Sequence, residues 1–347
     1  GGPSNSGIRS FAVKPKGASF ELVDSHEVIW KILGTDIDFG YDGSIYISDW
    51  VNGWDGLGKG RIYKFWNLEA AKTPAIAQTI MSKGFAHRSN EELVTLLSHA
   101  DRRVRQEAQF ALVGNGAIDE LIEVSKAGES QLARIHAIWG LGQFVRQALE
   151  ISDQSSDKIE RTISALFRDT DSEIRAQVCR ILPDYRAAVA KKYAARFKAT
   201  KEKADAAAKE SAAAAKERAA RFKKFLSEYS TAGEKRGYSF AHKISKHDGL
   251  LVHLLSDDSL RVRSMAALAL DLRSQPETAL RYLVKLLNEN KSDDPIVRHS
   301  AAVALSKIPD ATLVTNGLPE ASPAARMGIT LALRRQKSKE LARLLDD

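Results

Sequence analysis

The residues best suited to binding a ligand lie within the first 61 positions. They are carboxylates, tryptophans and one arginine in a glycine-rich stretch: Asp36, Asp49, Trp50, Trp54 and Arg61. Carboxylates at loop edges can coordinate Ca²⁺ or accept hydrogen bonds from sugar hydroxyls, and tryptophan faces suit stacking on sugar rings. These five residues are the ligand-binding candidates.

The same stretch also fits a purely structural role. Asp42 and Asp55 each precede a glycine and suit turns, while Trp50 and Trp54 can cover the seam between the strands and the first helix. Asp-Gly and Trp-x-Gly sequences are common in the turns of β-propellers, and this favours the structural interpretation. The ligand-binding interpretation stays open beside it.

Sequence motifs of familiar catalytic and cofactor sites are absent. The chain contains no Gly-x-Gly-x-x-Gly, Walker A or Gly-x-Ser-x-Gly motif. Cys179 is the single cysteine, so these residues hold no intrachain disulfide, multi-cysteine zinc site or Cys-x-x-Cys-His heme attachment. Its place on an apolar helix face predicts a buried thiol. We predict no metal site, and we expect His242 and His247 at the surface because neither has a carboxylate at metal-ligand spacing.

Positive charge is concentrated in one part of the chain. Of 347 residues, 44% are hydrophobic and 28% are charged, with a formal net charge of +8. Residues 186–224 contain 13 Lys and Arg against 4 Asp and Glu, so the rest of the chain is close to neutral. No run approaches the roughly 18 apolar residues of a membrane span, so we predict no transmembrane segment.

Residues 1–68 are predicted to be a small antiparallel β segment. β-Branched and aromatic residues alternate or cluster at residues 8–13, 19–23, 37–39, 44–48 and 60–65. Asp42-Gly43 predicts a hairpin, because glycine accepts the positive φ of such a turn. The segment equals about one to one and a half four-stranded propeller blades, which is too little to close a propeller.

A helical repeat follows a linker predicted at residues 69–89. Each repeat has an arginine, a small or apolar residue three positions later and a leucine seven positions later. The six arginines are Arg105, Arg134, Arg175, Arg263, Arg298 and Arg326. Four aspartates stand ahead of them as predicted N-caps: Asp101, Asp171, Asp258 and Asp294.

The pattern Asp-x-x-Val-Arg-x-x-Ala-x-x-x-Leu resembles the second helix of HEAT repeats over residues 90–347. In such repeats arginine and aspartate usually form a ladder between neighbours, so the resemblance implies a structural role for the six arginines. The predicted fold is mainly α: a HEAT-repeat α-solenoid with a small N-terminal antiparallel β segment, a partial propeller blade.

A gap in the arginine spacing predicts a basic helical insertion at residues 186–246. Residues 186–229 contain neither Gly nor Pro and are dominated by Ala, Lys, Glu and Arg. We expect a solvated arm, either one long helix or a helical hairpin. Its charge suits an acidic partner surface through residues 186–229, and a solvated helix without a partner is the alternative.

The order of these segments carries a further resemblance. The stretch from Asp36 to Trp50, then Gly58-Lys59-Gly60-Arg61-Ile62-Tyr63, then helical repeats, resembles the large membrane-bound dehydrogenases of planctomycete-type bacteria. The resemblance implies a periplasmic or exported protein. It also implies a propeller like that of glucose/sorbosone dehydrogenases and a c-type heme module elsewhere in the protein. No catalytic residue and no cofactor of this chain follows from it, because neither active site is complete here.

The predicted function is a scaffold or protein-interaction module of such an exported, heme-linked sugar or alcohol dehydrogenase. Its partners would be flanking propeller or cytochrome domains or another protein, and whether the chain is itself enzymatic stays open. The alternative is a HEAT-like nucleic-acid-binding protein that uses the basic insertion. Two features disfavour it: the near-neutral remainder of the chain, and the lack of aromatic residues between Phe197 and Phe222 to stack on bases.

Overall fold

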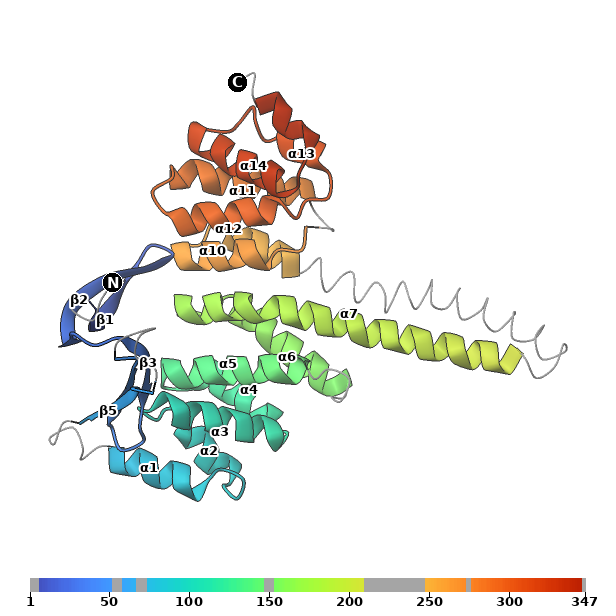
Figure 1. Cartoon of the computed structure of the whole chain (residues 1–347). Coiled ribbons are helices and arrows are strands. Elements are labelled where there is room, and N and C mark those ends of the chain that lie inside the picture. The colour runs from blue at the N-terminus through green and yellow to red at the C-terminus, as the bar shows by residue number, and fades with distance from the viewer. Residues whose placement is uncertain are drawn as a thin grey trace. The chain divides into compact units, whose positions relative to one another are not determined.

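The computed structural model describes residues 6–51, 58–66, 74–146, 153–208, 247–272 and 276–344 (Figure 1). The chain divides into two compact units, Gly1–Ala117 (unit 1) and Ile118–Asp347 (unit 2). The strands, all in unit 1, are β1 (Gly7–Lys16), β2 (Ser19–Trp30), β3 (Gly34–Phe39), β4 (Ile45–Asp49) and β5 (Arg61–Phe65). Its helices are α1 (Pro74–Lys83), α2 (Asn90–Leu96) and α3 (Arg102–Gly114).

All regular secondary structure in the described residues of unit 2 is helical. In chain order it contains α4 (Ile118–Ala127), α5 (Gln131–Arg146), α6 (Asp153–Leu166), α7 (Ser172–Ala208), a helix at residues 247–254, α10 (Leu260–Ala269), α11 (Pro276–Asn290), α12 (Pro295–Leu305), α13 (Ala311–Thr315), α14 (Pro323–Arg335) and a 3₁₀ helix, η4 (Lys339–Leu344). No described helix is long and apolar enough to cross a membrane.

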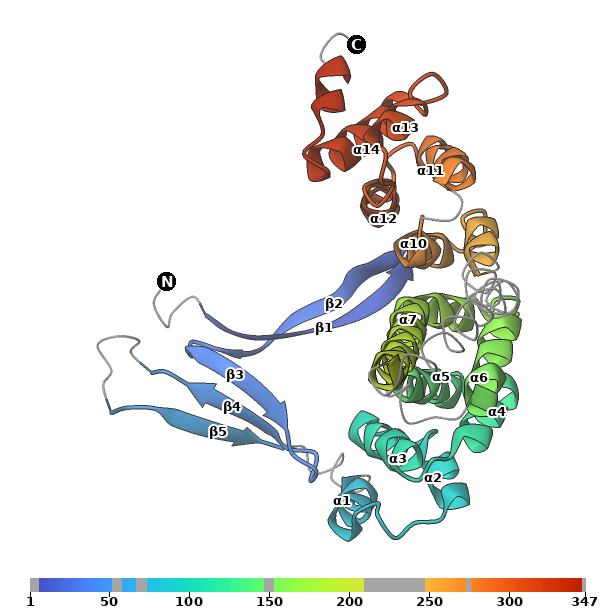
Figure 2. The ribbon, with the colours of Figure 1, turned by 90° about the vertical axis from the view of Figure 1, so that its right-hand side faces the viewer.

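The β segment of unit 1 forms two separate antiparallel sheets (Figure 2). β1 and β2 pair as a long ribbon, and β3, β4 and β5 form a meander. The hairpin predicted at Asp42-Gly43 is confirmed: it joins β3 to β4, Gly43 has a φ of 78°, and the Asp42 carboxylate accepts a hydrogen bond from Ser44 N. No sheet closes on itself among the described strands, so the propeller prediction gains no support.

Arg103 joins the meander to the helices within unit 1. Its guanidinium donates to the backbone oxygens of Phe39 and Gly40 and lies 4.2 Å from the ring centroid of Tyr41. The Asp101 carboxylate holds the same guanidinium at 2.7 Å, and this hydrogen bond lowers the pKa of Asp101. One side chain at the start of α3 therefore fixes the β3–β4 turn against the first described repeat.

The helices of unit 2 pair into repeats that form two layers (Figure 2). The second helix of each pair, called the B helix below, packs on the B helix of the next pair in the order α5, α7, α10, α12 and α14. The first helices, among them α4, α6 and α11, form the other layer. The predicted mainly α repeat fold with a small N-terminal antiparallel segment is confirmed.

The repeat register is confirmed at every position. The leucine seven residues after each patterned arginine is buried: Leu112, Leu141, Leu182, Leu270, Leu305 and Leu333. The residue three positions after each arginine is also buried: Ala108, Ala137, Val178, Ala266, Ala301 and Ile329. These positions share one helical stripe, so each B helix buries that stripe against its neighbours.

One of the four predicted N-caps is wrong. Asp101 and Asp294 cap α3 and α12, and the Asp171 carboxylate accepts from Glu173 N in the first turn of α7. The N-cap of α10 is Ser259, whose hydroxyl accepts from Val262 N, and not Asp258. The reason is local. The Asp257 carboxylate accepts a hydrogen bond from Ser259 N, so the turn before α10 spans residues 257–259 and the helix starts after Ser259, one residue later than predicted.

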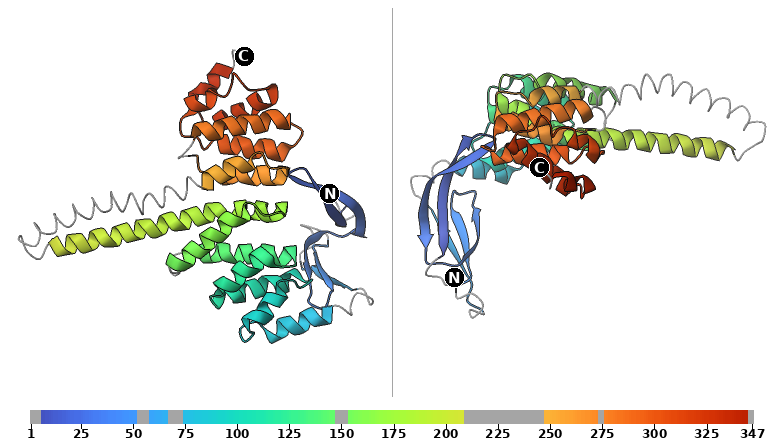
Figure 3. Two further views of the ribbon diagram at one scale, coloured as in Figure 1. Left: turned by 180° about the vertical axis from the view of Figure 1, so that it is seen from behind. Right: turned by 90° about the horizontal axis from the view of Figure 1, so that it is seen from above.

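The predicted insertion does not begin at a break in the structure. α7 continues as one helix from its repeat portion to Ala208, and Figure 3 shows its C-terminal half reaching past the other helices of unit 2. Arg186, taken as the first residue of the insertion, is buried in the repeat portion, and Ala188 is the last buried residue among those of α7 whose burial is described. Residues 209–246 of the predicted insertion lie outside the described part of the chain. The predicted linker at residues 69–89 contains α1.

Replacing Leu270 with alanine tests the register energetically. Leu270 is 2% exposed, whereas Leu268, two residues earlier, is 36% exposed. We expect Leu270→Ala to lower the free energy of unfolding by about 2–5 kcal/mol because it opens a cavity. Leu268→Ala should change it by no more than about 0.5 kcal/mol. Urea unfolding of the two variants measures the contrast, and equal losses would contradict the register.

Candidate functional site

The five ligand-binding candidates of the β segment do not converge on one site among the described residues. Asp49 is buried, and its carboxylate accepts hydrogen bonds from the backbone nitrogens of Leu33 and Val51, each at 2.9 Å. Asp36 pairs with Ser48, the residue before Asp49, so Asp36 and Asp49 point to opposite faces of the sheet. The geometry gives Asp49 the role of holding the ends of β3 and β4 together.

Two of the other three candidates, Arg61 and Trp50, are exposed, and the third lies outside the described residues. Arg61 lies across from Asp49 on β5, but its guanidinium donates to the Tyr63 hydroxyl at 3.2 Å. Trp50 is exposed. Trp54 lies outside the described residues. No group of three or more His, Cys, Asp or Glu side chains that could hold a metal ion occurs in the described ranges.

Asp42 is held as a structural turn residue. Lys64 donates to its carboxylate at 2.8 Å, and Ser44 N donates at 3.0 Å. These two hydrogen bonds, that of Lys64 first, lower the pKa of Asp42 from 3.8 to about 2. Because the pKa is depressed in the folded state, the stabilisation is present above pH 3.8 and is lost as the pH falls toward 2.

The Asp42–Lys64 contact predicts a titration that can be observed directly. In Lys64→Met the pKa of Asp42 should rise from about 2 toward 3.8, because the strongest donor to the carboxylate is gone. Carbon-13 NMR of the side-chain carboxyl measures it. Lys16→Met, a change on the β1–β2 ribbon, is the control and should leave this pKa where it is. An unchanged pKa in Lys64→Met would show that Ser44 N alone sets it.

Three of the patterned arginines tie each repeat to the next. Arg134 forms an ion pair with Asp169, Arg175 with Asp257 and Arg263 with Glu289. In each pair the acid belongs to the following repeat, at or near the loop between its two helices. We call these three contacts the arginine ladder.

The same guanidinium groups also satisfy carbonyl oxygens of their own repeat. Arg134 donates to Ser125 O, Arg175 to Asp169 O and Arg263 to Asp257 O. Arg105, in unit 1, donates in the same way to the backbone oxygens of His99 and Ala100. Each arginine thus replaces water at the end of a first helix, where carbonyl groups lack partners within the helix.

The last two patterned arginines, Arg298 and Arg326, differ from each other. Arg326 donates to a backbone oxygen of its own repeat, Leu318 O, at 3.4 Å. The guanidinium of Arg298 makes no hydrogen bond or ion pair with any residue that the structure describes. It lines a groove between α12 and α14 instead.

That groove has a volume of about 370 Å³ and is lined by two B helices. The lining residues are Pro295, Arg298, His299, Ala302, Val303, Leu331 and Arg335. No acidic residue is among these described lining residues, and Leu331 is exposed. We call this the α12–α14 groove.

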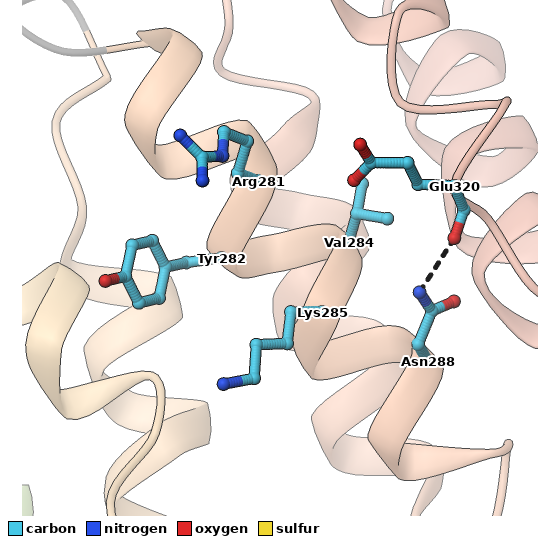
Figure 4. A pocket seen from close by; sticks show the side chains of 6 residues that line it. All are labelled: Arg281, Tyr282, Val284, Lys285, Asn288 and Glu320. Carbon is cyan, nitrogen blue, oxygen red and sulfur yellow. Dashed lines mark hydrogen bonds between the residues drawn. The ribbon is translucent and has the colours of Figure 1, made fainter.

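A second hollow, of about 470 Å³, lies over α11 on the opposite layer (Figure 4). Arg281, Tyr282 and Lys285 point into it from α11. Glu320 also lines it, its backbone oxygen accepting from the Asn288 amide at 2.9 Å. Because an acid shares the hollow with the two cations, it is less suited to an anionic ligand than the α12–α14 groove.

Sequence reasoning missed a buried ion pair at the base of the insertion. Arg186 donates to the Asp248 carboxylate at 2.6 Å and to Ala269 O at 3.0 Å, with both charged side chains almost fully buried. His247 is also buried, contrary to the surface position predicted for it, and its ring lies beside Phe167 and Tyr185. No local signal marks these residues, since the partners are 62 positions apart.

Cys179 is fully enclosed in the repeat core, as its position on an apolar helix face predicts. Burial raises the pKa of the Cys179 thiol, so the reactive thiolate is disfavoured. The side chain acts as a small apolar residue of α7.

Comparison with known proteins identifies part of the repeat region. Residues 248–330 match the family model described as HEAT repeats, which confirms the HEAT-repeat prediction there. No curated protein is significantly similar to the chain. The comparisons give no support to the resemblance with membrane-bound dehydrogenases, which stays a hypothesis.

Several solved structures are similar at low sequence identity. An engineered protein from the Northeast Structural Genomics Consortium is 17% identical with a TM-score of 0.38, covering 72% of this chain and 97% of that chain. A designed armadillo repeat protein in complex with a (KR)4 peptide is 15% identical with a TM-score of 0.37, covering 72% and 100%. The E. coli protein YibA is 17% identical with a TM-score of 0.34, covering 82% and 91%.

Breaking a contact of the arginine ladder should lower the free energy of unfolding more than breaking an exposed ion pair on the same helix, α7. Arg175 and Asp257 have side chains 14% and 8% exposed, whereas Arg146 and Asp184, an exposed pair between α5 and α7, are 52% and 48% exposed. Arg175→Met should lower the free energy of unfolding by about 3 kcal/mol, because it leaves a largely buried carboxylate without its cation.

The matched control is Arg146→Met, which should cost at most about 1 kcal/mol because water replaces the lost partner. Chemical denaturation of both variants measures the difference. A cost at Arg146 equal to that at Arg175 would mean that burial does not set the strength of these contacts.

Proposed function

Because residues 248–330 match HEAT repeats, we propose that unit 2 is a scaffold that binds another protein through the exposed side of its B helices. One observation carries the proposal. Of the exposed large hydrophobic side chains in the described part of unit 2, all but Tyr282 lie on B helices: Leu132, Leu268, Ile296, Met327 and Leu331. Exposed apolar residues gathered on one layer are typical of a protein-interaction surface.

The arginine ladder supports the same proposal. It anchors α5, α7 and α10 to the loops of the repeats that follow, so the B helices are held in place before a partner arrives. A surface that is already ordered loses less conformational entropy on binding. On α5, α10, α12 and α14 the buried stripe and the exposed apolar residues therefore have separate roles, the first in folding and the second in recognition.

Variants on the two layers test this function in the native host. Ile296→Asp and Met327→Asp, on α12 and α14, should reduce partner cross-linking at least tenfold because each places a charge within an apolar contact. Tyr282→Asp, on α11, is the matched exposed control and should leave cross-linking intact. Cross-linking mass spectrometry with the full chain gives both the yield and the residues joined.

The outcome that would reject the scaffold proposal is equally specific. Loss of the partner in Tyr282→Asp, or cross-links confined to residues outside the B helices, would mean that this layer is not the interface. Circular dichroism of each variant separates loss of binding from loss of folding.

A finer hypothesis places the scaffold in an exported, heme-linked dehydrogenase, with a c-type heme and a propeller supplied by other parts of that assembly. What supports it is the order of the elements, an antiparallel meander of β3, β4 and β5 followed by helical repeats. Heme absorbance that co-purifies with the cross-linked assembly from the periplasm would support it. A cytoplasmic assembly without redox activity would count against it.

Nucleic-acid binding by the basic insertion is the alternative proposal. In its described portion, Lys191, Lys198, Lys201 and Lys203 of α7 are exposed, against one exposed acid, Glu202. Binding of duplex DNA to the full chain, with an affinity that falls steeply as salt is raised, would favour this alternative.

A further inference from the structure

The α12–α14 groove combines unpaired cations with an apolar lining. We propose that it binds an acidic segment of the partner protein, with one large apolar side chain of that segment seated against Leu331 and Val303 and with carboxylates held by Arg298 and Arg335. The proposal rests on the scaffold function and specifies the chemistry of the partner. Three properties of the groove support it: its charge, its exposed apolar side chains and its volume.

No acidic residue that the structure describes neutralises the charge of the groove. Arg298 and Arg335 form no ion pair with any described residue, and none of the groove's lining residues is an acid. The equivalent arginines earlier in the chain, Arg175 and Arg263, are paired with Asp257 and Glu289. Two free guanidinium groups in one groove can each hold a carboxylate through two parallel hydrogen bonds.

The apolar part of the groove continues along both helices. Ile296 lies one turn before His299 on α12, and Met327 lies one turn before Leu331 on α14. Ile296, Met327 and Leu331 are all exposed, Met327 by 51%. A simple anion would leave these side chains in water, whereas a peptide with an apolar residue among its acids covers them.

The size of the groove also favours a peptide segment. Its volume of about 370 Å³ lies near the lower end of the roughly 300–1,000 Å³ of small-molecule sites. One aromatic or leucine side chain fits such a hollow, and the neighbouring residues of the segment can reach the rim. The groove is therefore an anchor point within a wider protein contact, consistent with the extended B-helix surface.

The hollow over α11 can be compared with the α12–α14 groove, because it too combines cations with an exposed large side chain. It also presents two cations, Arg281 and Lys285, and one large exposed side chain, Tyr282. There, however, Glu320 lines the hollow and Glu289 lies 3.7 Å from Lys285. Acidic groups already offset its charge, so an acidic segment should prefer the α12–α14 groove.

A fluorescein-labelled peptide of sequence Glu-Glu-Leu-Phe-Glu-Glu, titrated with the full chain in a fluorescence anisotropy assay, tests the proposal. The comparison peptides are Lys-Lys-Leu-Phe-Lys-Lys, which reverses the charge, and Glu-Glu-Gly-Ser-Glu-Glu, which removes the apolar anchor. We expect only the first peptide to bind well, with at least tenfold weaker binding of the other two. Raising the salt should weaken the first peptide's binding.

Protein variants then locate the binding. The double variant Arg298→Gln/Arg335→Gln should weaken binding of the acidic peptide at least tenfold, and the control Arg281→Gln/Lys285→Gln should change it less than twofold. Arg335→Gln alone, at an exposed position, should give a measurable part of the loss and guards against misfolding of the double variant. Leu331→Ser should weaken the Leu-Phe peptide but not its Gly-Ser counterpart.

The failing outcomes separate this inference from the scaffold function. If the acidic peptide does not bind, or binds the Arg298/Arg335 double variant as well as the wild type, this inference is overturned. The scaffold function would still stand if Ile296→Asp and Met327→Asp abolish partner cross-linking. A duplex DNA probe that competes with the peptide and loses binding more strongly in the double variant would overturn the proposal in favour of a nucleic-acid groove.

Discussion

The structure of unit 2 depends on the contacts that arginines of three B helices, α5, α7 and α10, make with the loops around them. Arg175 shows the arrangement in full: its guanidinium bonds Asp169 O of its own repeat and the Asp257 carboxylate of the next. One side chain thereby satisfies helix-end carbonyls and couples two repeats. Because a single repeat cannot bury its apolar stripe alone, this coupling keeps the buried leucines of neighbouring B helices in register.

In the proposed peptide site, arginine serves recognition where the arginine ladder ends. At Arg298 the following repeat provides no acid in the described contacts, and the guanidinium lines the α12–α14 groove beside Arg335. Desolvation and pairing make an arginine structural, while exposure beside Leu331 leaves its charge available to a ligand. A single repeat motif thus gives both the internal stability of the scaffold and its distinctive surface.

Local sequence determined the elements and their register. Alternating apolar residues and Asp42-Gly43 were sufficient to predict the β3–β4 hairpin, because turn geometry depends on the φ of one glycine. The arginine, alanine and leucine spacing predicted every buried stripe, because side chains three and four positions apart share a helix face. The burial of Cys179 followed from the same periodicity.

The tertiary structure alone decided which polar groups have partners. Nothing near Arg186 in the sequence indicates Asp248, and nothing in the motif distinguishes the paired Arg263 from Arg298. Strand register likewise separated Asp36 from Asp49, although the two looked alike as loop carboxylates. The physical reason is the distance along the chain over which each effect acts. Helical periodicity and turn geometry are set by a few neighbouring residues, whereas the burial and pairing of charges depend on residues brought together from distant parts of the chain.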